Sequence, residues 1–200
     1  MSELDTLAAR RKVCTDCALS QTRTNAVPGE GPKSPEIMFI GEGPGFHEDR
    51  QGRPFVGPAG KYLAELLASI GMRREQVYIA NVVKCRPPGN RDPLPGEIQA
   101  CRKYLDQQIE LLKPKVIVTL GRFSLTQFFP AETISRAHGK LHFWNNIMVF
   151  PMYHPAAALH QGNMRAHIEE DFRLLQETLS QTNLVLPHKQ EPSWEQLSLF

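Results

Sequence analysis

Four cysteines are the residues of this 200-residue chain with the most specific chemistry. Cys14 and Cys17 form a Cys-x-x-Cys pair, whereas Cys85 and Cys101 stand alone. A Cys-x-x-Cys pair brings two thiolates close together, as metal sites require, but lone cysteines also pack as small apolar side chains. The spacing leaves zinc and an iron–sulfur cluster equally open, with buried thiols that bind nothing as a weaker third interpretation.

A second set of residues could bind and activate a planar ligand. The glycine-rich segment 41–45 lacks the lysine of a nucleotide P-loop, but its bare backbone can approach a ring closely and it carries one carboxylate, Glu42. Asn81 and His154 each stand near the end of an apolar run, and Phe55 precedes an expected helix. Each residue alone also fits an ordinary role: a solvated turn, a loop cap, a structural histidine or a core phenylalanine.

Alternating strands and helices would position these residues. Short apolar and β-branched runs predict strands over 36–40, 77–83, 116–120 and 147–150. Apolar residues at helical spacing predict helices over 63–70, 97–112, 122–129 and 164–179. Such alternation is typical of a parallel sheet with helices on both faces, whose ligand site lies at the carboxyl ends of the strands. We expect the glycine-rich segment, Asn81 and His154 to meet at that edge.

The composition favours one α/β domain in the cytoplasm. Hydrophobic residues make up 41% of the chain, and 23 basic against 21 acidic residues give a net charge of only +2, so contact with a polyanion must be local. No apolar run is long enough for a membrane span, and residues 1–11 do not resemble a secretory signal. Disulfides are therefore not expected. The helical pattern ends at Leu179, which predicts a domain over 1–179 and a flexible tail over 180–200.

Six segments, taken together and in order, resemble the family 4 uracil-DNA glycosylases, which carry a [4Fe-4S] cluster. The segments are Cys14-x-x-Cys17, Gly41-Glu42-Gly43-Pro44-Gly45, Gly52-Arg53-Pro54-Phe55-Val56-Gly57, Asn81-Val82-Val83-Lys84-Cys85-Arg86-Pro87-Pro88, Cys101 and His154-Pro155. The resemblance implies a three-layer α/β/α fold with a central four-stranded parallel sheet. It also implies an enzyme of base-excision repair that hydrolyses the N-glycosidic bond of deoxyuridine in DNA, releasing uracil and leaving an abasic site.

The same resemblance decides between the metals. It implies that all four cysteines, Cys14, Cys17, Cys85 and Cys101, hold a [4Fe-4S] cluster with a structural role. Two places depart from the family pattern: Phe46-His47 stands where many relatives carry charged residues, and Ala137-His138 stands where an arginine is common.

By resemblance, the base-binding residues surround a uracil flipped out of the DNA. Gly41 and Gly43 border the base, Phe55 stacks on it, and the Asn81 carboxamide accepts from N3–H and donates to O4. Thymine differs from uracil only by a methyl group. We expect Glu48 to fill the space that this methyl would need.

The catalytic roles follow from the charges that develop during cleavage. The departing uracil anion needs stabilisation at O2, which the resemblance implies for His154. Well-known family 1 relatives carry an aspartate where Gly43 stands here, so Glu42 is the nearest replacement. Its carboxylate could orient water or stabilise the cationic sugar, and the sequence leaves both roles open.

The expected contacts with DNA are few. Leu159 could enter the space that the flipped base vacates, although ordinary packing also explains it. The predicted phosphate contacts are basic residues near the expected edge of the sheet: Lys84, Arg86, Arg91 and Arg165.

Two other functional classes compete with this interpretation. A non-catalytic, metal-stabilised DNA-binding module would need the cysteines and basic residues but not Asn81, Phe55 and Glu42 together. A redox protein built on the cluster would not need them either. We therefore favour the glycosylase, acting as a monomer on single- or double-stranded DNA.

The final residues suggest a protein partner. Gln196-Leu197-Ser198-Leu199-Phe200 matches the pentapeptide with which many bacterial repair and replication proteins bind the sliding clamp. Gln196 can form hydrogen bonds at the rim of an apolar cleft that Leu197, Leu199 and Phe200 enter. The alternative is that these side chains pack on the domain itself.

Overall fold

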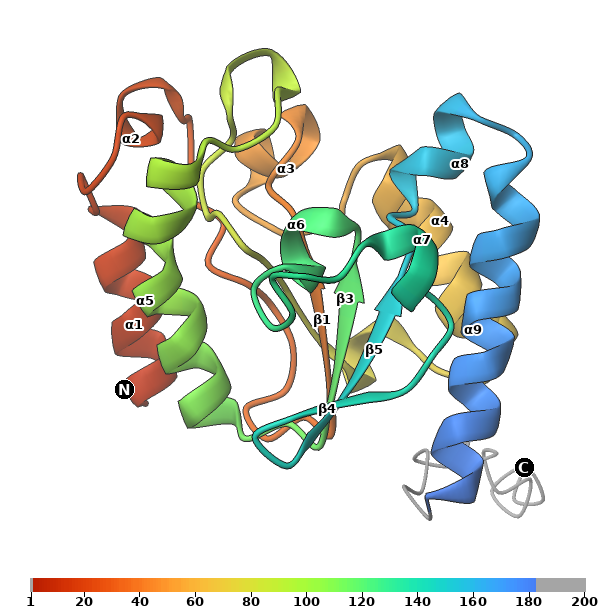
Figure 1. Cartoon of the computed structure of the whole chain (residues 1–200). Coiled ribbons are helices and arrows are strands. Elements are labelled where there is room, and N and C mark those ends of the chain that lie inside the picture. Colours follow the sequence, from red (N-terminus) through yellow and green to blue (C-terminus); the bar gives the residue numbers. More distant parts are fainter. Residues whose placement is uncertain (1, 183–200) are drawn as a thin grey trace, which may run out of the picture.

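The fold is a parallel β-sheet between two layers of helices, seen in a computed structural model that describes residues 2–182 (Figure 1). The sheet order is β2-β1-β3-β5-β4. Four of the strands run parallel: β1 (Ile37–Gly41), β2 (Tyr78–Asn81), β3 (Val116–Leu120) and β5 (Ile147–Met152). All side chains of β1, β2 and β3 are buried, because helices cover both faces of the sheet.

The sequence-based prediction of a four-stranded sheet is wrong by one strand, although the four parallel strands are present. The fifth, β4 (His142–Trp144), pairs antiparallel with β5 at the edge of the sheet. Asn145 and Asn146 join the two strands, and both have positive φ, at 47° and 64°. A two-residue hairpin needs this backbone, which asparagine tolerates, so the Asn-Asn pair between two apolar runs was a signal for the hairpin.

The helices divide between the two faces of the sheet. One face is covered by α1 (Glu3–Lys12) and α5 (Pro95–Leu112), and the other by α4 (Pro58–Ser69) and α9 (Met164–Gln181) (Figure 1). Alternate residues of β1 serve each face: Met38 packs toward α1 and α5, and Phe39 toward α4 and α9. The short helices are α2 (Leu19–Thr22), α3 (Phe46–Gln51), α6 (Arg122–Leu125), α7 (Ile134–Ala137) and α8 (Ala156–His160), with 3₁₀ turns at Arg74–Gln76 and Pro88–Asn90.

The last described helix, α9, ends at Gln181, two residues beyond Leu179, where the helical pattern of the sequence ends. The predicted clamp-binding residues Gln196, Leu197, Leu199 and Phe200 lie outside the described residues. None of the helices described between residues 2 and 182 combines the length and apolar character needed to cross a bilayer.

The start of α4 is packed directly against the loop before it. Phe55 has a positive φ of 51°, which is unfavourable for a bulky residue and must be held by its surroundings. Arg74 donates hydrogen bonds to the carbonyl oxygens of Phe55 and Pro54. A Cβ on Gly60 would lie 2.0 Å from the carbonyl oxygen of Phe55, so only glycine fits in this first turn.

We expect Gly60→Ala to lower the free energy of unfolding by about 1–3 kcal/mol, because the methyl group would collide with backbone that cannot yield. Gly96→Ala is the matched control, since Gly96 also lies in a first turn opened by proline and nothing surrounds its Cβ position. It should be neutral or stabilise by about 0.4–1 kcal/mol. Denaturant unfolding of both variants measures the difference, and equal stabilities would contradict the packing described for α4.

Candidate active site

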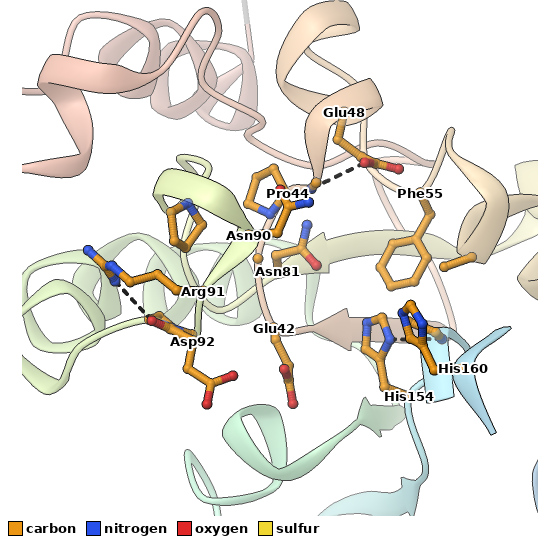
Figure 2. Close-up of a pocket in the computed structure, with 16 residues that line it drawn as sticks. Glu42, Pro44, Glu48, Phe55, Asn81, Asn90, Arg91, Asp92, His154 and His160 are labelled. Atoms are coloured by element: carbon orange, nitrogen blue, oxygen red, sulfur yellow. Dashed lines mark hydrogen bonds between the residues drawn. The ribbon is translucent and has the colours of Figure 1, made fainter. Parts of the chain in front are cut away.

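A cavity of about 310 Å³ opens at the carboxyl ends of the parallel strands (Figure 2). The loop after β1 lines one side with residues 42–45, and Asn81 ends β2 at its base. Residues 90–93 and the segment from His154 to His160 close the rim. The site therefore lies where the strand order predicts it. The structure brings together the glycine-rich loop and three other residues predicted from the sequence, Asn81, Phe55 and His154.

Asn81 presents an unsatisfied amide oxygen to this cavity. The residue is 1% exposed, and its Oδ1 is buried without a hydrogen-bond partner. A Cβ on Gly41 would lie 2.4 Å from that oxygen, so the glycine leaves the amide room. Buried polar atoms are almost always hydrogen-bonded, which makes this oxygen a site for a donor supplied by a ligand.

Two rings stand beside the amide. The Phe55 and His154 rings are stacked with their centroids 5.5 Å apart and their planes at 30° (Figure 2). Phe55 is 6% exposed, and a Cβ on Gly41 would lie 2.7 Å from its ring atoms. The cavity thus has an apolar ring face next to an amide, the combination that a flat, polar heterocycle needs.

His154 is neutral and carries its proton on Nε2. The backbone N–H of Ala156 donates to Nδ1 at 3.1 Å, which leaves Nε2 as the protonated nitrogen. Burial lowers the pKa of His154 to about 4, against the opposing charge of Glu48. At neutral pH the ring is therefore an uncharged donor on the cavity wall.

Glu48 ties together the two loops that form the upper wall. Its Oε1 accepts from the backbone N–H groups of Val56 and Gly57, both at 2.8 Å, and its Oε2 accepts from Gly45 at 3.1 Å. The side chain is 8% exposed, and a Cβ on Gly45 would lie 2.8 Å from Oε2. A carboxylate with three backbone donors is held in one position.

Glu42 lies on the wall away from Glu48, beside the start of α6 (Figure 2). Burial raises the pKa of its carboxyl group, while the backbone N–H of Phe123, 3.5 Å from Oε1, lowers it. Gly121 has a φ of +90°, and a Cβ there would lie 2.4 Å from Glu42 Oε1. The Glu42 carboxylate can therefore occupy this position only because residue 121 is a glycine.

The structure contradicts one predicted phosphate contact. Lys84 is fully buried, and its Nζ donates to the backbone oxygen of Asn81 and to Gln108 Oε1, both at 2.6 Å. Burial lowers the pKa of this lysine to about 7. Its ammonium group points inward between β2 and α5, so it cannot meet DNA and instead supports the backbone of Asn81.

The other predicted DNA contacts lie at the surface. Arg91 lines the cavity and pairs with Glu97 at 2.7 Å, and Arg165 pairs with Glu169 at 2.9 Å. Arg86 donates to Asn90 Oδ1 at 2.6 Å. Leu159, on α8, is 49% exposed. The Arg165–Glu169 pair is exposed, as pairs that contribute little to stability are, whereas Glu97, which accepts two hydrogen bonds from Arg91, is only 5% exposed.

The four cysteines converge on a second, smaller pocket. Cys85 and Cys101 are buried, and Cys14 and Cys17 are partly exposed. Burial raises the pKa of the Cys17 and Cys101 thiols, and for Cys101 the charges of Arg11 and Lys84 oppose that shift. Within residues 2–182, no group of three or more His, Cys, Asp or Glu side chains is arranged to hold a single metal ion.

Cations surround this pocket. Arg23 and Arg11 donate to Cys85 Sγ at 3.2 and 3.8 Å, and the backbone N–H of Lys84 donates to Cys101 Sγ at 3.3 Å. Arg11 is 2% exposed, and its guanidinium carbon lies 4.0 Å from the centre of the Tyr104 ring. These donors favour thiolate over thiol.

Sequence reasoning missed several residues that hold the site in place. In the sequence, only the closeness of Arg11 and Arg23 to the Cys-x-x-Cys pair could have indicated their role. Nothing in the sequence indicated a role for Arg74. Asp171 on α9 is 1% exposed, and its carboxylate accepts from the backbone of Tyr153 at 3.4 Å and lies 2.8 Å from His138 Nδ1. Asp171 thus fixes the backbone of Tyr153, the residue before His154, although the two segments are distant in sequence.

Comparisons with known proteins agree on one family. Residues 28–176 match the model of the uracil DNA glycosylase superfamily. A type-4 uracil-DNA glycosylase of Sulfurisphaera tokodaii is 50% identical over 187 residues, 88% of this chain and 85% of the relative. Its counterpart in Saccharolobus solfataricus is 50% identical over 93% of this chain and 91% of the relative. That of Thermotoga maritima is 46% identical over 84% and 90%.

These matches cover the loop after β1, the end of β2 and the segment around His154, which together form the cavity. The chain therefore belongs to the uracil-DNA glycosylase superfamily, within which it is a type-4 member.

Proposed function

We propose that this protein hydrolyses the N-glycosidic bond of deoxyuridine in DNA, releasing uracil and leaving an abasic site. The observation that carries the proposal is the buried, unpartnered Oδ1 of Asn81 beside the ring of Phe55. Uracil offers an N3–H donor at the edge of a flat ring, which matches both features. A base inside a duplex cannot reach such a cavity, so the nucleotide must flip out.

The hydrogen bonds that fix Asn81 and Glu48 in the cavity wall support selectivity for uracil. In the proposed pose Asn81 accepts from N3–H and donates to O4, whereas cytosine presents an acceptor and a donor at these positions. The Lys84 ammonium anchors the Asn81 backbone. The Glu48 carboxylate, bound by three backbone donors beside Gly45, cannot swing away to admit the methyl group of thymine.

Cleavage generates negative charge on uracil and positive charge on the sugar. We assign the Nε2–H of neutral His154 to the O2 atom of the departing anion, because a fixed donor in a buried site stabilises developing charge strongly. We assign Glu42 to the sugar side, where it orients water or stabilises the cation. Both roles need the ionised form, which the Phe123 amide supports.

Neither competing class accounts for this cavity. A DNA-binding module or an electron-transfer protein would have no use for a buried amide oxygen that lacks a partner, since such an atom costs stability unless a ligand satisfies it.

The test is excision of uracil from DNA by two pocket variants. Asn81→Ala and His154→Ala should each lower the single-turnover rate about 10²–10³-fold, because each removes a group that contacts the leaving base. Asn163→Ala is the control, since this exposed residue makes no capping hydrogen bond at the start of α9. Pocket variants that fold normally and excise uracil at the wild-type rate would refute the assigned roles.

We also propose that Cys14, Cys17, Cys85 and Cys101 hold a [4Fe-4S] cluster. Their convergence on one pocket, where Arg11 and Arg23 donate to Cys85 Sγ, supports it, because these positive groups offset part of the charge of four thiolates. The cluster would be structural, joining the segment after α1 to the loop after β2 and to α5.

Protein purified without oxygen should be brown and contain about four iron atoms per chain, because each thiolate binds one iron of the cluster. Cys85→Ser should lose the colour and unfold at a lower temperature than the wild type, because cluster binding is coupled to folding. Iron analysis, visible absorption and thermal unfolding measure these effects. A colourless protein with stoichiometric zinc would refute the cluster.

The final five residues are proposed to bind the bacterial sliding clamp. This proposal rests on the sequence alone, in which Gln196, Leu197, Leu199 and Phe200 match the clamp-binding pattern. Docking there would raise the concentration of the enzyme at newly replicated DNA.

We expect a variant ending at Glu195 to lose measurable affinity for the clamp, since it lacks the apolar side chains that would enter the cleft. Leu199→Ala should weaken binding strongly, whereas Ser198→Ala, at the position expected to face outward, should bind like the full chain. Titration of purified clamp provides the measurement. Equal affinities for the full chain and the shortened variant would end the proposal, whatever the glycosylase activity.

A further inference from the structure

An exposed aromatic ring stands at the mouth of the cavity. Phe46 begins α3 and is 49% exposed. It follows Gly45, which lines the cavity, and the Arg86 side chain beside its ring donates to Asn90, which also lines the cavity, so the ring stands close to the entrance. The site described above does not use this side chain.

Two arginines flank the ring. The guanidinium carbon of Arg86 lies 5.2 Å from the centre of the Phe46 ring, and that of Arg50 lies 5.9 Å away. Both guanidinium groups lie over the ring, and the His47 ring meets it edge-on with centroids 5.6 Å apart, but with 49% of Phe46 exposed part of the ring remains accessible. Arg50 comes from α3 itself and Arg86 from the loop after β2, so two separate elements build the group.

These arginines differ from others nearby in their partners. Arg91 pairs with Glu97 and Arg122 with Asp92, whereas neither Arg50 nor Arg86 has a carboxylate partner among residues 2–182. Their charge is therefore not neutralised by the protein. A half-exposed aromatic ring beside two uncompensated guanidinium groups matches the needs of an unpaired nucleotide, whose base stacks on a ring and whose phosphate pairs with arginine.

We propose that Phe46, Arg50 and Arg86 form a subsite for the nucleotide next to the flipped uridine on the same strand. This proposal rests on the proposed function, because the neighbouring nucleotide reaches the ring only if uridine occupies the cavity. The base of that nucleotide stacks on Phe46 and its phosphate contacts Arg86 or Arg50. The subsite favours single strands, in which the neighbouring base is free to leave its stack.

The experiment compares Phe46→Ala with Phe143→Ala on a single-stranded oligonucleotide that contains one uracil. Phe143 is a matched control, since it is 65% exposed and lies on β4, at the opposite end of the sheet from the cavity (Figure 1). We expect Phe46→Ala to raise KM about ten-fold, in line with the loss of one base-stacking contact. Phe143→Ala should behave like the wild type.

A second substrate separates stacking from general packing. When both neighbours of the uridine are abasic spacers, the difference in KM between Phe46→Ala and the wild type should shrink toward one-fold, because no base remains to stack. Phe46→Trp should retain the preference for neighbouring bases, whereas Phe46→Leu, apolar but not aromatic, should lose it. An equal loss on both substrates, or no loss on either, would overturn the subsite.

A binding measurement distinguishes this proposal from the proposed function. An oligonucleotide with 2-aminopurine next to uracil should change its fluorescence when wild-type protein binds, and the change should be reduced with Phe46→Ala. If the wild type releases no uracil, the proposed function fails. If the fluorescence change is the same for both proteins, the subsite fails even where uracil is released.

Discussion

The hydrogen bonds of the buried residue Lys84 join the two sites of this molecule, the cavity and the cysteine pocket. Its Nζ donates to the backbone of Asn81 and to Gln108, while its backbone N–H donates to Cys101. A buried amine is costly unless acceptors surround it, and the two acceptors of Lys84 fix the path by which the chain leaves β2. On that path Asn81 faces the cavity, and Cys85 faces the other cysteines. The Asn81 amide and the cysteine pocket are thus fixed by the same few residues.

Glu48 imposes a similar constraint on the other wall of the cavity. Its three backbone hydrogen bonds link the loop after β1 to the loop before α4. The unfavourable φ of Phe55 persists because Arg74 donates a hydrogen bond to the Phe55 carbonyl oxygen, and because Gly60 has no Cβ to collide with that oxygen. Strain at a ligand-facing residue is sustained only when its surroundings over-determine it, as these contacts do. The cavity is therefore preorganised for a flat ligand.

Charge is distributed unevenly between the floor and the rim. The floor holds a neutral His154 and an amide, which suit an uncharged base that becomes an anion during cleavage. The rim carries Arg91, and beside the cavity Arg50 and Arg86 flank Phe46 without carboxylate partners among the described residues. A chain with a net charge of only +2 can therefore meet a polyanion locally, at the edge where its chemistry takes place.

The sequence by itself determined the alternation of strands and helices, the edge of the sheet that carries the site, and the residues Asn81, Phe55 and His154 that meet there. Apolar periodicity and glycine-rich breaks report local burial and chain direction, and these suffice to order parallel strands. Only the tertiary structure decided that Lys84 is buried, that the Glu48 carboxylate binds three backbone donors, and that Arg11 and Arg23 meet Cys85. Side-chain direction and partners distant in sequence are set by how whole elements pack, which no local pattern records. For that reason a basic residue beside a cysteine looked like a phosphate contact in the sequence but serves as an internal anchor in the fold.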